Sequence, residues 1–290
     1  RKWGVPIPIF FCKECGEAHI DNDAMMAVSD LFEKEGSNAW YSHTAAEILP
    51  EGTKCKKCGC TEFEKEKDIM DVWFDSGSSH AAVVSKRDNL KFPADLYLEG
   101  NDQYRGWFQS SLLTSVATEG VAPYKAVLTH GMILDEEKRK MSKSLGNGIS
   151  PQDVTEKYGA DVLRLWVSST DYQSDVHISN EILKQISESY RKIRNTARYI
   201  LGNVYDFNPD TDSVPVNELM PMDKWAIVKL NELIAKVKQA YDNYEFHQVY
   251  HSIRNFCVID MSNFYLDVLK DRLYTEKSDS KSRKAAQTAL

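Results

Sequence analysis

Two closely spaced pairs of cysteines constrain how the first part of this 290-residue chain folds. Cys12 and Cys15 form one C-x-x-C pair, and Cys55 and Cys58 form a second pair further along. The first residues do not have the layout of a secretory signal, so this spacing favours metal coordination over disulfides. Four thiolates suit a tetrahedral structural zinc ion and leave no open position for catalysis. The sequence therefore predicts two turns that meet around zinc, with a segment between them that folds out and returns.

The same region leaves two alternatives open. Cys60 lies two residues after Cys58 and is an alternative fourth ligand. Five reduced thiols without metal are the other interpretation, and Cys257 stands apart from the group.

The composition excludes some classes of protein. Hydrophobic residues make up 42% of the chain and charged residues 27%, which is typical of a globular protein with two or three domains. No apolar run reaches the length of a membrane span, so we expect no membrane partner. The net charge of −7 argues against nucleic acid as the dominant partner but allows a local basic stripe. The chain lacks an initial Met and ends in an expected helix, so we expect a fragment of a longer cytoplasmic protein.

The region 69–148 reads as α/β. We expect a buried strand at 95–100, a helix at 103–118 and a second strand at 125–134, which together predict a right-handed crossover in a parallel sheet. The expected apolar face of the helix consists of Trp107, Leu112, Leu113 and Val116. Ligands of such sheets bind at the carboxyl ends of strands. Polar and glycine residues that follow the two strands should therefore face one crevice: Glu99, Gly100, Asp102, His130 and Gly131.

The rest of the chain reads as all-α. Ser150 is a good N-cap and Pro151 suits the first position of a helical region at 150–169. Apolar stripes with helical spacing predict further helices at 179–204, 222–241 and 246–268, with a break at 208–210. A helix near 23–35 is also expected. We predict four regions and a truncated antiparallel bundle at the end: 1–68, 69–148, 149–180 and 181–290.

A short basic loop contains the residues that are most indicative of a chemical function. Lys140-Met141-Ser142-Lys143-Ser144 alternates ammonium groups with hydroxyls and is followed by two glycines. This stretch resembles the KMSKS loop of class I aminoacyl-tRNA synthetases. Attack of a carboxylate on ATP builds negative charge on phosphate oxygens, and positioned lysines and hydroxyls stabilise such charge without covalent bonding. A solvated basic loop is the competing interpretation.

Four further stretches narrow the resemblance: "KWGVPIP", "DIMDVWFDSGSSH", "LYLEGNDQYRGWF" and "GADVLRLWVSSTDY". Together they look like isoleucyl-tRNA synthetases of the bacterial type, over nearly the whole chain. The resemblance implies the C-terminal half of a class I Rossmann fold with a small zinc-binding insert before it. A partial anticodon-binding helix bundle would follow.

The resemblance also implies roles by position. The expected phosphate-binding lysines are Lys140 and Lys143. The expected ATP and adenylate contacts are Glu99, Gly100, Asp102, His130, Gly131, Ile133 and Ser142. Trp73 and Trp107 would wall the isoleucine pocket, and Gln103 would hold the amino-acid head group. Taken alone, the two tryptophans would more often be core residues, and Asp102 and Gln103 an exposed helix start.

A basic stripe lies on the expected helix at 179–204. Arg191, Arg194 and Arg198 share one face by their spacing, and Lys184 precedes them. A solvated face and a contact with the tRNA backbone are both consistent with it.

We therefore expect part of an isoleucine–tRNA ligase that uses ATP and Mg²⁺, holds structural zinc and acts on isoleucine and tRNA(Ile), with a monomeric parent. The His-x-Gly-His motif and the threonine-rich editing peptide of that family do not occur here and are expected N-terminal to Arg1. The chain alone should therefore be inactive. A non-enzymatic zinc and RNA-binding module, and another class I nucleotidyltransferase, are the alternatives.

Overall fold

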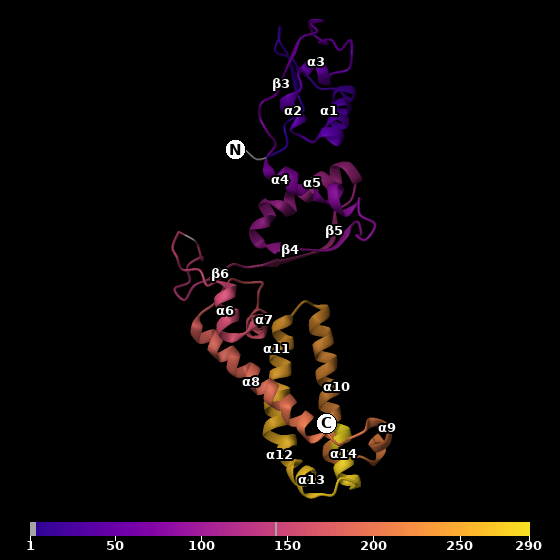
Figure 1. The fold of residues 1–290 in the computed structure, drawn as a ribbon, viewed down its shortest axis with the longest axis vertical. Helices are drawn as coiled ribbons and strands as arrows, with labels where there is room; N and C mark the ends of the chain where they lie inside the picture. Colours follow the sequence, from indigo (N-terminus) through magenta and orange to yellow (C-terminus); the bar gives the residue numbers. More distant parts are fainter. Residues whose placement is uncertain (1–3, 143) are drawn as a thin grey trace. The chain divides into compact units, whose positions relative to one another are not determined.

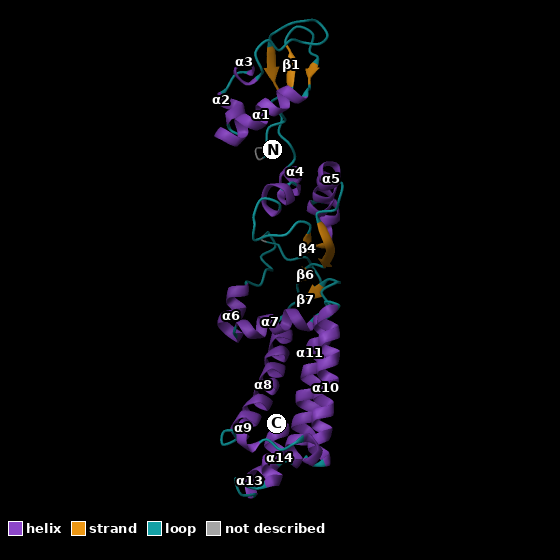
Figure 2. Ribbon diagram, turned by 90° about the vertical axis from the view of Figure 1, so that its right-hand side faces the viewer, coloured by secondary structure: helices purple, strands orange, loops and turns teal. Residues whose placement is uncertain are grey.

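The computed structural model describes residues 4–142 and 144–290, which form two compact units that divide after Thr129. Figure 1 labels the helices and strands along the chain, and Figure 2 separates them by type. Each unit is described by itself. In the described part of the chain, no helix is both long and apolar enough to cross a bilayer.

The first unit begins with a small antiparallel sheet. Its strand order is β2-β1-β3, with β1 (Phe10–Cys12) between β2 (Ala18–His19) and β3 (Phe63–Lys65). Three helices complete this part: α1 (Asn22–Glu35), α2 (Ala39–Ser42) and α3 (Ala45–Ile48). The predicted helix near 23–35 is confirmed as α1.

Local chemistry explains where these elements begin and how they pack. The Ala24 amide donates to the Asp21 side chain at 2.9 Å and so caps the start of α1. The core beneath consists of buried apolar residues, with Phe10 and Trp40 at its centre, 5.1 Å apart between ring centroids. Burial of two such rings is among the largest apolar contributions a domain this small obtains.

The remainder of the first unit alternates helices and strands. In chain order it contains α4 (Val72–Gly77), the π-helical turn η1 (His80–Val84), β4 (Ala94–Gly100), the 3₁₀ turn η2 (Asn101–Arg105), α5 (Trp107–Glu119) and β5 (Tyr124–His130). The strands β4 and β5 are hydrogen-bonded neighbours, and α5 connects them. The predicted order of strand, helix and strand is confirmed.

Two details of that prediction are wrong. The strand predicted to be buried has Tyr97 and Gly100 buried, whereas Leu98 is 54% exposed, because neighbouring side chains of a strand point to opposite faces. The apolar stripe predicted for α5 is also not its buried face, since Leu113 is 60% exposed. The buried residues of α5 are instead Phe108, Ser111 and Ser115, and the hydroxyls of Ser111 and Tyr97 lie 3.0 Å apart.

A glycine divides the strand that was predicted at 125–134. The structure has β5 up to His130 and a separate β6 (Ile133–Leu134), which pairs in parallel with β7 (Val176–His177) of the second unit. A Cβ atom at Gly131 would lie 2.4 Å from the backbone of Ser174. The chain therefore turns where only glycine fits, and the strand ends there.

The second unit is otherwise helical (Figure 2). Its long helices are α8 (Asn180–Asn203) and α10 (Pro221–Asp242), which confirm the predictions for 179–204 and 222–241. The shorter elements are α6 (Pro151–Tyr158), α7 (Ala160–Ser169), α9 (Pro209–Asp212), η3 (Val216–Glu218), α11 (Phe246–Asn255), η4 (Phe256–Tyr265), α12 (Leu266–Val268), α13 (Lys270–Thr275) and α14 (Lys281–Ala289).

Two predicted helices are interrupted. The helix expected at 150–169 divides into α6 and α7 at Gly159, whose φ of 91° is unsuited to an α-helix. The predicted N-cap is confirmed, because the Gln152 amide donates to the Ser150 hydroxyl at 3.2 Å. The helix expected at 246–268 contains the π-helical segment η4 in its middle.

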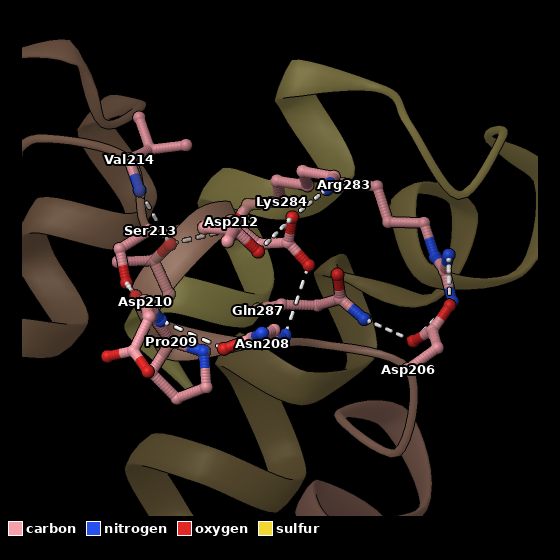
Figure 3. A network of polar contacts seen from close by, with 12 residues as sticks. Asp206, Asn208, Pro209, Asp210, Asp212, Ser213, Val214, Arg283, Lys284 and Gln287 are labelled. Atoms are coloured by element: carbon pink, nitrogen blue, oxygen red, sulfur yellow. Dashed lines mark hydrogen bonds and ion pairs between the residues drawn. The ribbon is translucent and has the colours of Figure 1, made fainter.

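Ion pairs join the end of the chain to the helices before it. Figure 3 shows Arg283 and Gln287 of α14 reaching Asp206, with Arg283 Nη1 donating at 2.8 Å. A second pair has a fully buried carboxylate: Arg272 donates two hydrogen bonds to Asp223, at 2.9 and 2.8 Å. The first set of contacts ties α14 to the segment that follows α8, and the second pair ties α13 to α10.

Candidate functional site

The four predicted cysteine ligands converge in the first unit. The sulfur atoms of Cys12, Cys15, Cys55 and Cys58 all lie within 4.8 Å of one another. The Cys12 and Cys58 sulfurs are 3.5 Å apart, and the Cys15 and Cys55 sulfurs 3.6 Å. Zinc–sulfur bonds of about 2.3 Å in a tetrahedron place sulfurs about 3.8 Å apart. The donor set and its spacing therefore fit a tetrahedral metal ion.

Two tight turns produce this convergence. Gly16 follows the first pair with φ 68°, its amide donating to the Cys12 carbonyl; Gly59 follows the second pair with φ 78° and donates likewise to Cys55. The backbone amide of Cys15 lowers the pKa of the Cys12 thiol to about 6. The amide of Cys58 similarly lowers the pKa of Cys55. Burial raises the pKa of the Cys15 and Cys58 thiols. Each turn therefore favours the thiolate, the form that binds metal, at its first cysteine.

Cys60 lies outside the group of four sulfurs. Its sulfur accepts a hydrogen bond from the Glu62 amide at 3.3 Å, and its carbonyl accepts from the Cys55 amide at 2.8 Å. Cys60 thus supports the second turn, and Cys58 supplies the sulfur that faces Cys12.

The residues predicted for the amino-acid pocket also come together in the first unit. A pocket of about 440 Å³ is lined by Trp73, Ser76, Ser79, Glu99, Gln103 and Trp107. Of these, Trp73 comes from α4, Glu99 from the end of β4, and Trp107 from the start of α5. The arrangement combines two indole walls with an amide and a carboxylate, which suits a ligand with an apolar side chain and a polar head.

A backbone hydrogen bond and a ring contact fix the Trp107 indole. Trp107 Nε1 donates to the Ser76 carbonyl at 3.0 Å, which ties α5 to α4. The Trp107 ring also stacks on Tyr97 with centroids 4.2 Å apart. A Cβ atom at Gly106 would lie 2.6 Å from Gln103 Oε1, so the absence of a side chain there allows Gln103 to accept from the Trp107 amide.

Two other predicted residues lie beside this pocket. Gly100 is buried and its amide donates to Glu99 Oε1 at 3.0 Å, while Asp102 is exposed in η2. The structure thus brings the predicted residues of 73–107 into one region of the first unit.

The predicted ATP residues of the second unit lie around β6. His130 Nδ1 donates to the Gly131 carbonyl at 2.8 Å, and Ile133 is 45% exposed. Lys140 forms an antiparallel bridge with Leu134, so the chain turns back between them. The hydroxyls of Ser142 and Ser144 lie 3.1 Å apart. Lys143 lies outside the described residues.

Sequence reasoning missed the residues that hold this loop. Asp135 accepts from the Glu137 and Arg139 amides at 3.0 and 2.8 Å, from Arg139 Nε at 3.0 Å and from Asn147 Nδ2 at 2.8 Å. The Asn147 side chain and the Arg139 amide and guanidinium lower the pKa of the Asp135 carboxyl to about 2. An aspartate directly after a strand, and an asparagine after the glycine at the loop end, were the available signals.

The predicted basic stripe is exposed on α8. Lys184, Arg191, Arg194 and Arg198 all face solvent, and helical spacing places them along one side.

Comparison with known families covers most of the chain. The family described as class I tRNA synthetases (I, L, M and V) matches residues 1–179. The anticodon-binding domain of tRNA ligases matches residues 223–290.

Curated relatives match along the whole chain. It is 62% identical over 290 residues to the isoleucine–tRNA ligase of Caldanaerobacter subterraneus subsp. tengcongensis and 61% identical to that of Caldicellulosiruptor saccharolyticus. The chain spans 31% and 32% of the lengths of these two relatives.

Solved structures share the fold. A leucyl-tRNA synthetase from Agrobacterium radiobacter K84, solved with tRNA and LeuAMS, superposes with a TM-score of 0.65 over 99% of this chain and 36% of that one, at 19% identity. A methionyl-tRNA synthetase from Mycobacterium tuberculosis, solved with methionyl-adenylate, gives 0.61 over 76% of this chain and 44% of that one, at 22% identity.

Proposed function

This chain belongs to the class I tRNA synthetases, and from that premise we propose that it is part of an isoleucine–tRNA ligase. The ligase would activate isoleucine with ATP to isoleucyl-adenylate and transfer the isoleucyl group to tRNA(Ile). The names of the relatives support the substrate, and the pocket between Trp73 and Trp107 is the observation that carries the proposal.

The pocket suits a branched aliphatic side chain. In this proposal the indoles of Trp73 and Trp107 enclose the side chain, while Gln103 and Glu99 contact the polar groups of the substrate. An apolar wall of this kind excludes larger side chains by steric overlap. It separates isoleucine from valine only weakly, because one methylene contributes about 1–3 kcal/mol.

The loop around Lys140 would act on the triphosphate. The isoleucine carboxylate attacks the α-phosphorus of ATP and pyrophosphate leaves, so negative charge builds on phosphate oxygens. Lys140, Lys143 and the Ser142 hydroxyl would stabilise that charge, with Mg²⁺ neutralising the leaving group. His130, Gly131 and Ile133 would line the adenine, while Glu99, Gly100 and Asp102 would contact the ribose and its phosphate.

The other two features would serve the architecture and the second substrate. Zinc held by Cys12, Cys15, Cys55 and Cys58 would cross-link the two turns, and its chemistry would be structural. The exposed stripe of Arg191, Arg194 and Arg198 would contact the tRNA backbone ahead of the anticodon-binding helices. We place the parent enzyme in the cytoplasm as a monomer.

A panel of amino acids tests the proposal. In the full-length protein, exchange of labelled pyrophosphate into ATP should depend on isoleucine, with valine about 10- to 200-fold less efficient. The 290-residue chain alone should not catalyse exchange. Exchange driven by an unrelated amino acid would contradict the proposal.

A pair of variants tests the pocket. Trp73→Ala should raise the KM for isoleucine about 10-fold or more, because one apolar wall is lost. Tyr205→Ala is the matched control, since Tyr205 is an aromatic residue that is 80% exposed in the second unit. An unchanged KM in Trp73→Ala would remove Trp73 from the pocket.

A further inference from the structure

One side chain joins the end of β6 to the loop that carries the lysines. Asn147 Nδ2 donates to Asp135 Oδ2 at 2.8 Å and to the Lys140 carbonyl at 3.4 Å. Asn147 Oδ1 accepts from the Ser142 amide at 3.0 Å. A single amide group therefore holds the backbone at both Lys140 and Ser142 and connects it to a carboxylate after the strand.

The carboxylate is itself fixed on its other side. Asp135 is 8% exposed, and the Glu137 and Arg139 amides and the Arg139 guanidinium occupy the rest of its oxygen lone pairs. The turn between them includes Lys138 with φ 63°, so the backbone adopts a conformation that needs support. Asp135 is thus an anchor that belongs to the strand end, and Asn147 transmits its position to the loop.

The chemistry requires an asparagine. An aspartate at 147 would still accept from the Ser142 amide, but it would have no donor for Asp135 or for the Lys140 carbonyl, and it would place two carboxylates side by side. The pair is therefore sensitive to a change of one atom, which makes it testable with nearly isosteric variants.

We propose that Asp135 and Asn147 are positioning residues for adenylate formation, which hold Lys140 and Ser142 where the phosphates bind. This inference rests on the proposed function of the loop. Neither residue needs to touch ATP. Their effect is to keep the cation and hydroxyl in place before the reaction, and a displacement of about 1 Å can cost about 100-fold in rate.

Kinetics of the full-length protein test the pair. Asn147→Asp should lower the rate constant of adenylate formation about 100-fold, with the KM for isoleucine unchanged, because the loop does not form the side-chain pocket. Asp135→Asn should also slow the step.

Glu136→Gln is the matched control, since it removes a neighbouring carboxylate that is exposed. It should leave the rate within about 2-fold, in line with other exposed substitutions. A rate in Asn147→Asp equal to wild type would overturn the proposal.

A second readout does not depend on activity. In the 290-residue chain, Asn147→Ala should speed hydrogen exchange of the Ser142 amide, whereas Glu136→Gln should not. An unchanged rate of hydrogen exchange in Asn147→Ala would contradict the role of Asn147 in holding the Ser142 amide. If the full-length wild type shows no isoleucine-dependent exchange of pyrophosphate, the proposed function fails; if only the variants behave as wild type, this inference alone fails.

Discussion

The cysteine cluster and the basic loop are built in opposite ways. In the cluster, the groups that would bind the ion contact one another directly, with sulfurs 3.5 and 3.6 Å apart. In the loop, Asn147 hydrogen-bonds the backbone of Lys140 and Ser142, and Asp135 accepts a hydrogen bond from Asn147. In the cysteine cluster, the side chains that would bind the ion also form the site. In the basic loop, the proposed phosphate-binding groups are positioned by Asp135 and Asn147, which need not contact ATP.

This difference predicts how each region responds to a lost contact. Removing a thiolate removes part of the ion's coordination and should disturb the fold around it. Removing the contact between Asp135 and Asn147 should leave the fold intact and slow the proposed adenylate formation, because only the positions of Lys140 and Ser142 change.

The largest expected effect concerns the zinc ion that we propose at the four cysteines. Purified without chelator, the chain should contain about one zinc ion, and chelation or Cys12→Ala should unfold the sheet β2-β1-β3. In zinc-finger peptides, structural zinc contributes about 10–16 kcal/mol of apparent binding free energy at pH 7. Hydrogen exchange should show the sheet opening while α8 and α10 stay protected, and Cys60→Ala should retain the metal. A folded sheet without zinc would contradict this prediction.

The next largest effect is expected at a buried carboxylate in the second unit, compared with an exposed ion pair of the same unit. Asp223 is fully buried and receives two hydrogen bonds from Arg272 and one from Tyr265. Arg272→Met should lower the free energy of unfolding of this unit by about 3–5 kcal/mol, since it leaves an unpaired buried charge.

Lys229→Met is the control for that variant. Lys229 forms an exposed pair with Glu232 at 2.8 Å, so its loss should cost less than about 1 kcal/mol. Denaturant unfolding measures both variants. Equal losses of unfolding free energy in the two variants would show that the burial of Asp223 does not make its ion pair more important for stability than the exposed pair.

The smallest effect concerns pH. The pKa of Asp135 is about 2 in the folded chain, below its ordinary value, so its contribution is present above about pH 4 and is lost as pH falls through 2. An NMR titration of the Asp135 carboxyl should give this value and show it rise in Asn147→Ala. The Asp135 carboxyl should therefore stay ionised between about pH 5 and 8. An unchanged pKa in Asn147→Ala would break the link between the two residues.

The sequence was sufficient for features set by local spacing. C-x-x-C pairs followed by glycine, the N-cap at Ser150 and the apolar period of α8 each determine structure within a few residues. The same reasoning failed at Gly131 and Gly159, where a close approach and a positive φ interrupt a continuous apolar pattern.

The contact between Asp135 and Asn147 could not be predicted for a related reason. Asp135 and Asn147 are twelve residues apart in the sequence, and their contact depends on how the chain turns back at Lys140. The buried face of α5 was missed because it consists of Phe108 and two serines with hydrogen-bonded hydroxyls, Ser111 and Ser115, rather than of its leucines. Spacing alone does not indicate that polar residues will be the buried ones.

Single-turnover formation of isoleucyl-adenylate by the full-length protein tests the central claim most directly. Lys143→Ala should slow this step by about 2–4 kcal/mol of barrier, as for loss of one group that stabilises the transition state, while the isoleucine dissociation constant stays the same. Lys157→Ala, which removes the same charge from α6, should have little effect. A large rise in the isoleucine dissociation constant with an unchanged rate would contradict the assignment of this loop to the phosphates of ATP.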